Sequence, residues 1–181
     1  LLLAAPDLTD KMRQRLLRIE RATQQSTDLT TALLMLSRSE RGSGRSDVRR
    51  MVEAQAEANR VHLGSKPVAL RVDGQHDVFV DAPEAVLSVA LNNLIGNACK
   101  YTLEGEVAVT VLAGRVEVAD TGPGIASGEG ERLFERGYRG ASSAGSKGAG
   151  IGLAIVRRLC DLYGWRVRLE PRVDRQGSLA T

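Results

Sequence analysis

Two asparagines and a lysine lie at helical spacing in the segment "LNNLIGNACKYT", residues 91–102. Asn93 and Asn97 are four residues apart and Lys100 follows three residues later, so the three share one face of a helix. The remaining positions are mostly apolar, and amides cost free energy when they are buried without partners. Mg²⁺ takes oxygen ligands and shares them with phosphates, which an ammonium also suits. This face therefore predicts a metal and phosphate site, and the alternative is a polar helix face in water.

A carboxylate ends a predicted strand in "VADTGPGI". Asp120 is followed by Gly122 and Gly124, which let the backbone turn tightly and approach a ligand closely. A carboxylate at this place can accept a hydrogen bond from an exocyclic amine such as that of adenine. The alternative is an ordinary turn, because "DTGPG" has turn chemistry in any context.

Glycines open an apolar helix in "GSKGAGIGLAIV", where backbone N–H groups favour anions. Two common phosphate loops do not fit this stretch. The P-loop needs Gly-Lys-[Ser/Thr], whereas Lys147 precedes Gly148. The dinucleotide pattern needs a final Gly, but this position holds Leu153 when the pattern is read from Gly148. Each glycine cluster alone is weak evidence for a nucleotide site, whereas the order of the clusters along the chain is stronger evidence. The glycines are Gly145, Gly148, Gly150 and Gly152.

The composition excludes several function classes. The chain has 181 residues, of which 43% are apolar, so it is neither disordered nor a membrane chain. No apolar run approaches the roughly 20 residues of a spanning helix, and no signal-peptide pattern opens the chain. The first residue is Leu, so we expect a fragment whose membrane anchor, if it has one, lies outside it. A net charge of +3 and 3% aromatic residues argue against nucleic acid.

The two cysteines, Cys99 and Cys160, each sit in an apolar helical pattern. We interpret both as buried free thiols in a reducing compartment. Two cysteines and two distant histidines do not form a zinc ligand cluster.

Hydrophobic periodicity predicts the elements that position these residues. Residues 9–40 form one long helix with an apolar stripe that needs a partner helix, and the Gly/Ser-rich residues 41–46 mark a domain boundary. Three further helices cover residues 47–61, 83–101 and 148–164. Short strands cover 66–74 and 77–82, a hairpin covers 106–120 with its turn at "AGR", and closing strands cover 165–171 and 177–181. Residues 121–148 are long and Gly-rich enough for a mobile lid. Helices that alternate with antiparallel strands indicate an α+β two-layer sandwich.

Four motifs together resemble the ATP-binding boxes of bacterial sensor histidine kinases. They are "NLIGNACKYT" (93–102), "DTGPGI" (120–125), "LFERGYRG" (133–140) and "GAGIGLAIV" (148–156), in the family's order and approximate spacing. The resemblance to the GHKL catalytic domain, the Bergerat ATP-binding fold, covers residues 46–181. Residues 1–43 are similar to part of the dimerisation and phosphotransfer hairpin, mainly its second helix.

The resemblance implies roles for individual residues. Asn97 would coordinate Mg²⁺, supported by Asn93, while Lys100 would meet phosphate. Asp120 would accept the adenine amine, and Arg139 would approach the terminal phosphate. Asn97, Lys100 and Arg139 would thus be catalytic. The other residues expected at the nucleotide are Tyr101 along the adenine, Gly122, Gly124 and Ile125 on its wall, Phe134 pinning the lid, Lys147 in the lid, and Gly148, Gly150, Ile151, Gly152 and Leu153 at the helix start.

The family's acceptor box, His-Glu-x-x-Thr/Asn-Pro, is absent from this chain. Neither His62 nor His76 has that context, so the acceptor is expected upstream of Leu1. The resemblance implies that the intact protein moves the γ-phosphate of ATP to that histidine and then to an aspartate of a response-regulator receiver domain. It also implies a homodimer formed through the hairpin and a cytoplasmic location, as part of an inner-membrane sensor.

Two other readings stay open. One is a different GHKL ATPase or kinase, which the Lys-Tyr-Thr after Asn97 and the long helix disfavour. The other is a non-catalytic docking or dimerisation module that keeps the fold, which the intact Asn97, Asp120 and glycines disfavour. A purely structural coiled coil does not explain residues 83–156.

Overall fold

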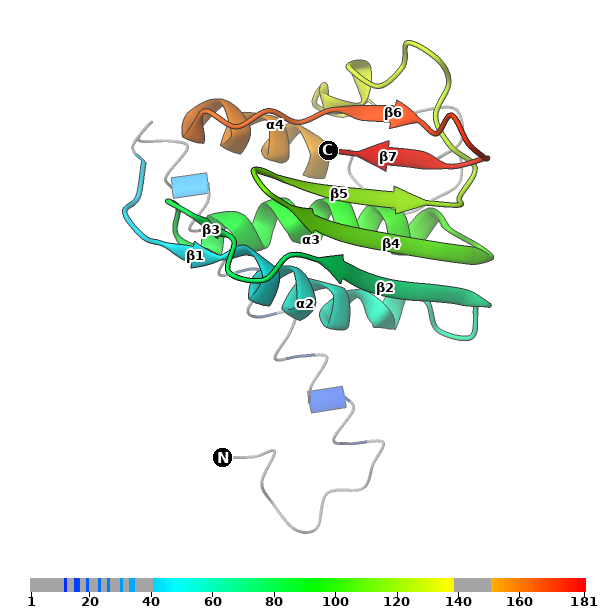
Figure 1. The fold of residues 1–181 in the computed structure, drawn as a ribbon, viewed down its shortest axis with the longest axis horizontal. Coiled ribbons are helices and arrows are strands. Elements are labelled where there is room, and N and C mark those ends of the chain that lie inside the picture. Colours follow the sequence, from blue (N-terminus) through cyan, green and yellow to red (C-terminus); the bar gives the residue numbers. More distant parts are fainter. Residues whose placement is uncertain are drawn as a thin grey trace.

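A mixed five-stranded sheet with three helices on one face forms the body of the protein (Figure 1). The structure is a computed structural model, and it describes residues 41–138 and 151–181 together with nine single positions between Met12 and Leu34. Those nine positions are helical, as predicted for this stretch. Among the residues that the structure describes, none of the helices combines the length and apolarity that crossing a bilayer requires.

The strands order as β2–β4–β5–β7–β6. Strand β2 (Val68–Gly74) pairs parallel with β4 (Gly105–Leu112), and β4 pairs antiparallel with β5 (Arg115–Asp120). Strands β7 (Ser178–Ala180) and β6 (Leu169–Pro171) complete the sheet with antiparallel pairing. The predicted β4–β5 hairpin is confirmed, with its turn at Gly114 in a positive-φ conformation.

The predicted antiparallel pairing does not hold at one edge of the sheet, where β2 and β4 are parallel. The strand predicted at 77–82 shortens to β3 (Phe79–Val80), which pairs with β1 (Ser46–Asp47) in a separate two-stranded sheet instead of adjoining β2. Strand β2 instead reaches β4 through a connection that contains α3 (Glu84–Tyr101), and a parallel pair requires such a crossover. Local patterning does not reveal which of two nearby strands a third will pair with.

The helical layer consists of α2 (Val48–Asn59), α3 and α4 (Gly152–Tyr163), with α3 in the middle (Figure 1). Helix α2 begins where predicted, because the Asp47 side chain accepts a hydrogen bond from the backbone N of Arg50 at 3.0 Å. It continues into the 3-10 turn η2 (Arg60–His62). A second short turn, η3 (Arg132–Phe134), precedes α4 in the chain.

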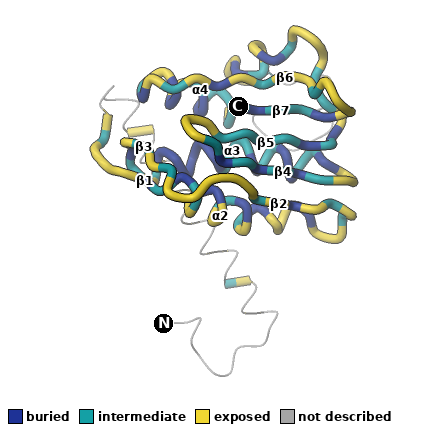
Figure 2. The backbone as a smooth tube through the Cα atoms, in the orientation of Figure 1, coloured by how far each residue is buried: buried dark blue, intermediate teal, exposed yellow. Residues whose placement is uncertain are grey.

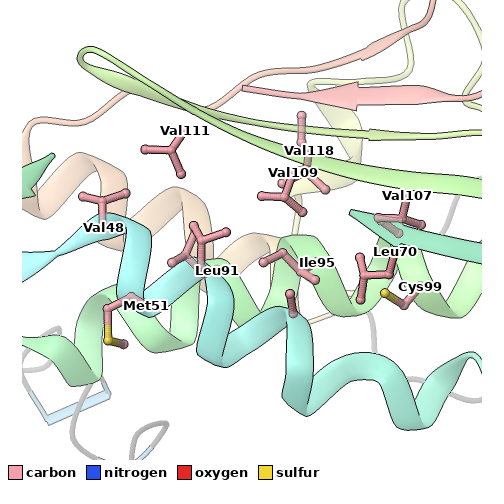
Figure 3. Close-up of a cluster of buried hydrophobic side chains, with 14 of the residues drawn as sticks. Val48, Met51, Leu70, Leu91, Ile95, Cys99, Val107, Val109, Val111 and Val118 are labelled. Carbon is pink, nitrogen blue, oxygen red and sulfur yellow. The ribbon is translucent and has the colours of Figure 1, made fainter. Parts of the chain in front are cut away.

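The main core lies between this layer and the sheet (Figures 2 and 3). Val107, Val109 and Val111 alternate along β4 and are fully buried against α2 and α3. From α3, Leu91, Ile95 and Cys99 point into the same cluster (Figure 3). Cys99 and Cys160 are both buried and free, as predicted. Helix α3 is therefore fixed on its core face, and this fixes the orientation of its polar face.

Candidate functional site

The polar row on α3 borders a small pocket next to α2. Asn93, Asn97 and Lys100 line it, as their spacing predicts, and Asn59 and His62 close the side formed by α2 and η2. The pocket measures about 180 Å³, which is below the roughly 300–1,000 Å³ of typical ligand sites. It has room for the polar end of a ligand. Asn92 and Gly96 complete its lining.

The Asn93 amide connects α3 to the start of α4. Its Nδ2 donates to the Val89 carbonyl oxygen at 2.8 Å, and its Oδ1 faces Gly152. A Cβ at position 152 would lie 2.1 Å from that oxygen, so any larger residue there would displace the Asn93 side chain. Gly152 therefore allows the close contact with Asn93.

The end of α3 is held by a lysine that sequence reasoning missed. Lys66 Nζ donates to the carbonyl oxygens of Cys99, Lys100 and Thr102 at 3.1, 2.9 and 3.0 Å. These groups would otherwise lack partners, and a cation at a helix C-terminus also suits the helix dipole. These three hydrogen bonds, the Lys66 clamp, fix the backbone that carries Lys100 and Tyr101. The Lys100 Nζ lies 5.0 Å from the centroid of the Tyr101 ring.

Asp120 lies buried at the end of β5 and is held by its own chain. Its Oδ1 accepts hydrogen bonds from the backbone N of Gly122 at 2.8 Å and of Ser178 at 3.3 Å, while Oδ2 accepts from the Ser178 hydroxyl. Each carboxylate oxygen has two lone pairs, so Oδ2 can accept a further donor. Ser178 was predicted only as part of a closing strand. The lone Ser in "GSLAT" gives no signal of its role, since it lies 58 residues from its partner.

Two glycines allow the chain to pack closely around Asp120. Gly177 has φ +138°, and a Cβ there would lie 1.9 Å from the Asp120 carbonyl oxygen. A Cβ on Gly122 would lie 2.9 Å from Asp120 Oδ1 and 3.4 Å from the Tyr101 carbonyl oxygen. The end of β5 therefore adjoins the end of α3, which brings Asp120 and Tyr101 into one region as predicted.

The described part of the predicted lid packs against β6 and α4. A Cβ on Gly130 would lie 2.0 Å from the Leu169 carbonyl oxygen and 3.6 Å from Ile125 Cδ1. Phe134 is buried in a cluster with Val156 and other residues, and the Arg157 guanidinium lies 4.6 Å from its ring centroid. This stretch, residues 121–138, is thus anchored at both Gly130 and Phe134.

Two further predicted residues lie at the start of α4, and a third lies beside the β6–β7 turn. Leu153 packs against the Phe134 cluster, Ile151 is exposed, and Gly124 has φ +75° beside the Gly177 carbonyl. Four predicted residues lie outside the described residues, namely Arg139, Lys147, Gly148 and Gly150.

His62 is the second side chain that sequence reasoning missed, because it was considered only as a phosphate acceptor. Partial burial of the ring, followed by the positive charges of Lys100 and Lys66, lowers the pKa of His62 below its ordinary value of 6.5. The ring is therefore neutral at pH 7, with one donor and one acceptor nitrogen. Among the described residues that line the pocket there is no carboxylate, so its electrostatics favour an anion.

Both the sequence and the fold match known proteins. The profile of one family, described as histidine kinase-, DNA gyrase B-, and HSP90-like ATPase, matches residues 82–181, more than half of the chain. The chain is 36% identical over 118 residues to the swarming motility regulation sensor protein RssA of Serratia marcescens, which covers 62% of this chain and 25% of RssA. It is 40% identical over 144 residues to the sensor histidine kinase AruS of Pseudomonas aeruginosa, covering 73% of this chain and 14% of AruS.

Two solved structures are similar over most of the chain. The mycobacterial sensor histidine kinase MprB matches with a TM-score of 0.64 and 25% identity, covering 77% of this chain and 94% of that one. Full-length ShkA in complex with AMPPNP matches with a TM-score of 0.67 and 29% identity, covering 99% of this chain and 40% of that one. The curated relatives are longer, since the chain spans a quarter of RssA and a seventh of AruS.

Proposed function

Because this chain belongs to the family of histidine kinase-, DNA gyrase B-, and HSP90-like ATPases, we propose that it is the ATP-binding kinase part of a sensor histidine kinase. Such a kinase transfers the γ-phosphate of ATP to a histidine and from there to an aspartate of a response regulator. Its relatives RssA and AruS are named as sensor proteins, and AruS as a histidine kinase. The acceptor histidine is proposed to lie outside this chain.

The observation that carries the proposal is the arrangement of two unlike sites along the last half of α3. At its end, the buried Asp120 adjoins Tyr101 and presents a carboxylate that Ser178 holds in place. Within the preceding turn, Asn97 and Lys100 line a pocket without a carboxylate among its described lining residues. The first site suits the exocyclic amine and ring of adenine, and the second suits phosphates. The ShkA structure, which covers nearly all of this chain, is titled as a complex with AMPPNP.

A magnesium ion fits this arrangement when it arrives together with phosphates. Mg²⁺ is usually held by one or two carboxylates plus substrate phosphates, and here the available protein oxygen is an amide of Asn97. The Asn93 amide bonds Val89 and faces Gly152, so Asn93 supports the site by positioning α4. When bound, the ion would neutralise charge on the phosphates. We expect the metal to bind weakly in the absence of nucleotide.

The chain's own residues would then act mainly by positioning. Lys100 supplies a positive charge to the phosphates, and Arg139 is proposed to approach the terminal one. Tyr101 would lie along the adenine ring. The buried Phe134 anchors the described part of the proposed lid, residues 121–148. Phosphoryl transfer depends on such positioning and charge stabilisation, because the protein contributes little covalent chemistry.

The intact protein is proposed to work as a cytoplasmic homodimer that docks a response-regulator receiver domain. The helix that precedes the ATP-binding domain supports this assembly, since Ile19, Leu33 and Leu34 are all exposed. An apolar stripe of this kind needs a partner helix. Association through this helix would place two catalytic domains beside a shared hairpin.

Nucleotide selectivity tests the proposal at the Asp120 end. Calorimetric titration should show binding of ATP but much weaker binding of GTP, which presents a carbonyl where adenine presents its amine. Asp120→Asn should weaken ATP binding by roughly tenfold or more, because a charge-assisted hydrogen bond is worth about 1.5–3 kcal/mol. Asp73→Asn, at an exposed position of β2, is the matched control. Equal binding of the two nucleotides, or no binding at all, would instead favour a docking module that keeps only the fold.

A further inference from the structure

The pocket beside α3 has a wall that the family motifs do not contain, formed by the last turn of α2 and by η2. Asn59 is 1% exposed, and its Nδ2 donates to the Gln55 carbonyl oxygen and to Asn92 Oδ1, both at 2.9 Å. Gly96 permits this approach, because a Cβ there would lie 2.8 Å from Asn59 Oδ1. The end of α2 is thus locked onto α3 at the level of Asn97.

His62 lies three residues beyond Asn59, and the backbone that follows it is fixed as well. Leu63 is buried, and its backbone N donates to the Arg60 carbonyl at 3.0 Å. Lys66 follows, with its backbone bonded to Leu63 and its ammonium clamped on the end of α3. These contacts fix the backbone on both sides of His62, and its exposed side chain borders the pocket, where a ligand can reach it.

The chemistry of the pocket points to an anion beside His62. Asn97 and Lys100 are the residues proposed to meet metal and phosphate, and His62 shares their pocket. The adenine end of the proposed site lies at Asp120 and Tyr101, where α3 ends. A volume of about 180 Å³ admits a phosphate group and water.

We propose that His62 is a further phosphate-binding residue, which donates a hydrogen bond to the terminal phosphate of ATP from the α2 side of the pocket. The proposal rests on the proposed nucleotide-binding function and names a residue that the four motifs do not include. His62 would distinguish ATP from ADP, since only ATP carries the terminal group. It would act together with Lys100, which lines the same pocket.

The chain's two histidines make a direct spectroscopic test possible. His76 lies in the β2–β3 connection, outside the pocket, and serves as the internal control. In proton NMR, addition of MgATP to the full chain should shift the imidazole resonances of His62 strongly and leave those of His76 in place. MgADP should shift them less. The variant His76→Ala assigns the two sets of signals.

Calorimetry provides the second test. His62→Ala should lower the affinity for MgATP roughly three- to tenfold, which corresponds to the loss of one hydrogen bond, and should change the affinity for MgADP little. His62→Gln, which keeps a donor, should recover part of the loss, and His76→Ala should bind as wild type. If wild type binds MgATP while the His62 resonances stay unmoved and His62→Ala binds both nucleotides normally, the proposal is wrong. If wild type binds no nucleotide, the proposed function fails instead.

Discussion

Asp120 and Ser178 show how much of this site depends on single contacts between distant residues. The carboxylate was predictable from the sequence, because it ends an alternating strand and precedes two glycines. Ser178 was not, because its hydroxyl reaches Asp120 only after β7 pairs with β5. His62 and Lys66 were missed for the same reason. Their partners on α3 lie about 33–38 residues away, and neither residue stands in a motif.

Loss of the Ser178 hydroxyl should affect both stability and binding. Ser178→Ala leaves Asp120 Oδ2 without its donor in a buried place, so we expect a loss of about 1–3 kcal/mol in the free energy of unfolding. ATP affinity should fall as well, because the carboxylate is no longer held. Urea denaturation and calorimetry measure the two effects. Ser65→Ala, at an exposed position, is the control, and equal behaviour of the two variants would contradict this account of Asp120.

Because both cysteines are buried, we expect the stability of the fold to depend on pH in the alkaline range. Burial raises the pKa of both thiols, Cys99 and Cys160, to about 11 from an ordinary value of 9.0. Between these values the unfolded chain has lost the protons that the folded chain keeps, so the free energy of unfolding should fall as pH rises from 9 towards 11. Denaturation midpoints over this range should decline less steeply in Cys99→Ala than in wild type. An unchanged slope would contradict the buried-thiol assignment.

At the scale of elements, α3 is the part of the fold that was easiest to predict and its surroundings the hardest. Its apolar spacing and its end at Tyr101 follow from the sequence, as does the β4–β5 hairpin with Gly114 at the turn. The parallel pairing of β2 with β4 does not follow, because it depends on the crossover through α3. The clamp at the end of α3 likewise depends on the position of Lys66 just before β2.

Removal of this clamp should loosen the end of α3. Lys66→Met leaves three carbonyl oxygens without their cation, so we expect a loss of about 1.5–3 kcal/mol in the free energy of unfolding. Lys66→Arg should retain part of this stabilisation, because it keeps a cation at the end of α3. Hydrogen exchange of the amides near Thr102 should rise in Lys66→Met, and ATP affinity should fall with it. Wild-type exchange rates in Lys66→Met would show that the end of α3 is held by other contacts.

At the scale of the whole molecule, the segment that follows the long helix is attached to α4. Arg41 Nε donates to the Leu162 carbonyl oxygen at 2.5 Å, and the backbone N of Gly42 donates to the Tyr163 hydroxyl at 3.1 Å. Helix α4 contacts Asn93 at its other end, so one rigid element reaches from the linker to the pocket. Sequence reasoning predicted a boundary at residues 41–46, but glycines and serines give no sign of this attachment.

Loss of the Arg41 contact should release the last turn of α4 without damage to the pocket. Arg41→Ala should raise hydrogen exchange near Tyr163 and change the fluorescence of Trp165, whose ring centroid lies 5.1 Å from that of Tyr163. ATP affinity of this chain should stay within about twofold of wild type, since surface substitutions away from a site have small effects. Arg45→Ala, near Phe79, is the matched control. Unchanged fluorescence and exchange would show that the linker is not coupled to α4.

The central claim is that α3 presents a metal-assisted phosphate site, and calorimetric titration of ATP into this chain tests it most directly. The titration is done with and without Mg²⁺, on wild type, on Asn97→Ala and on the exposed amide control Gln75→Ala. We expect metal-assisted binding that Asn97→Ala weakens by about 1–3 kcal/mol and Gln75→Ala leaves unchanged. Binding that is indifferent to both Mg²⁺ and Asn97, or no binding by wild type, would contradict it.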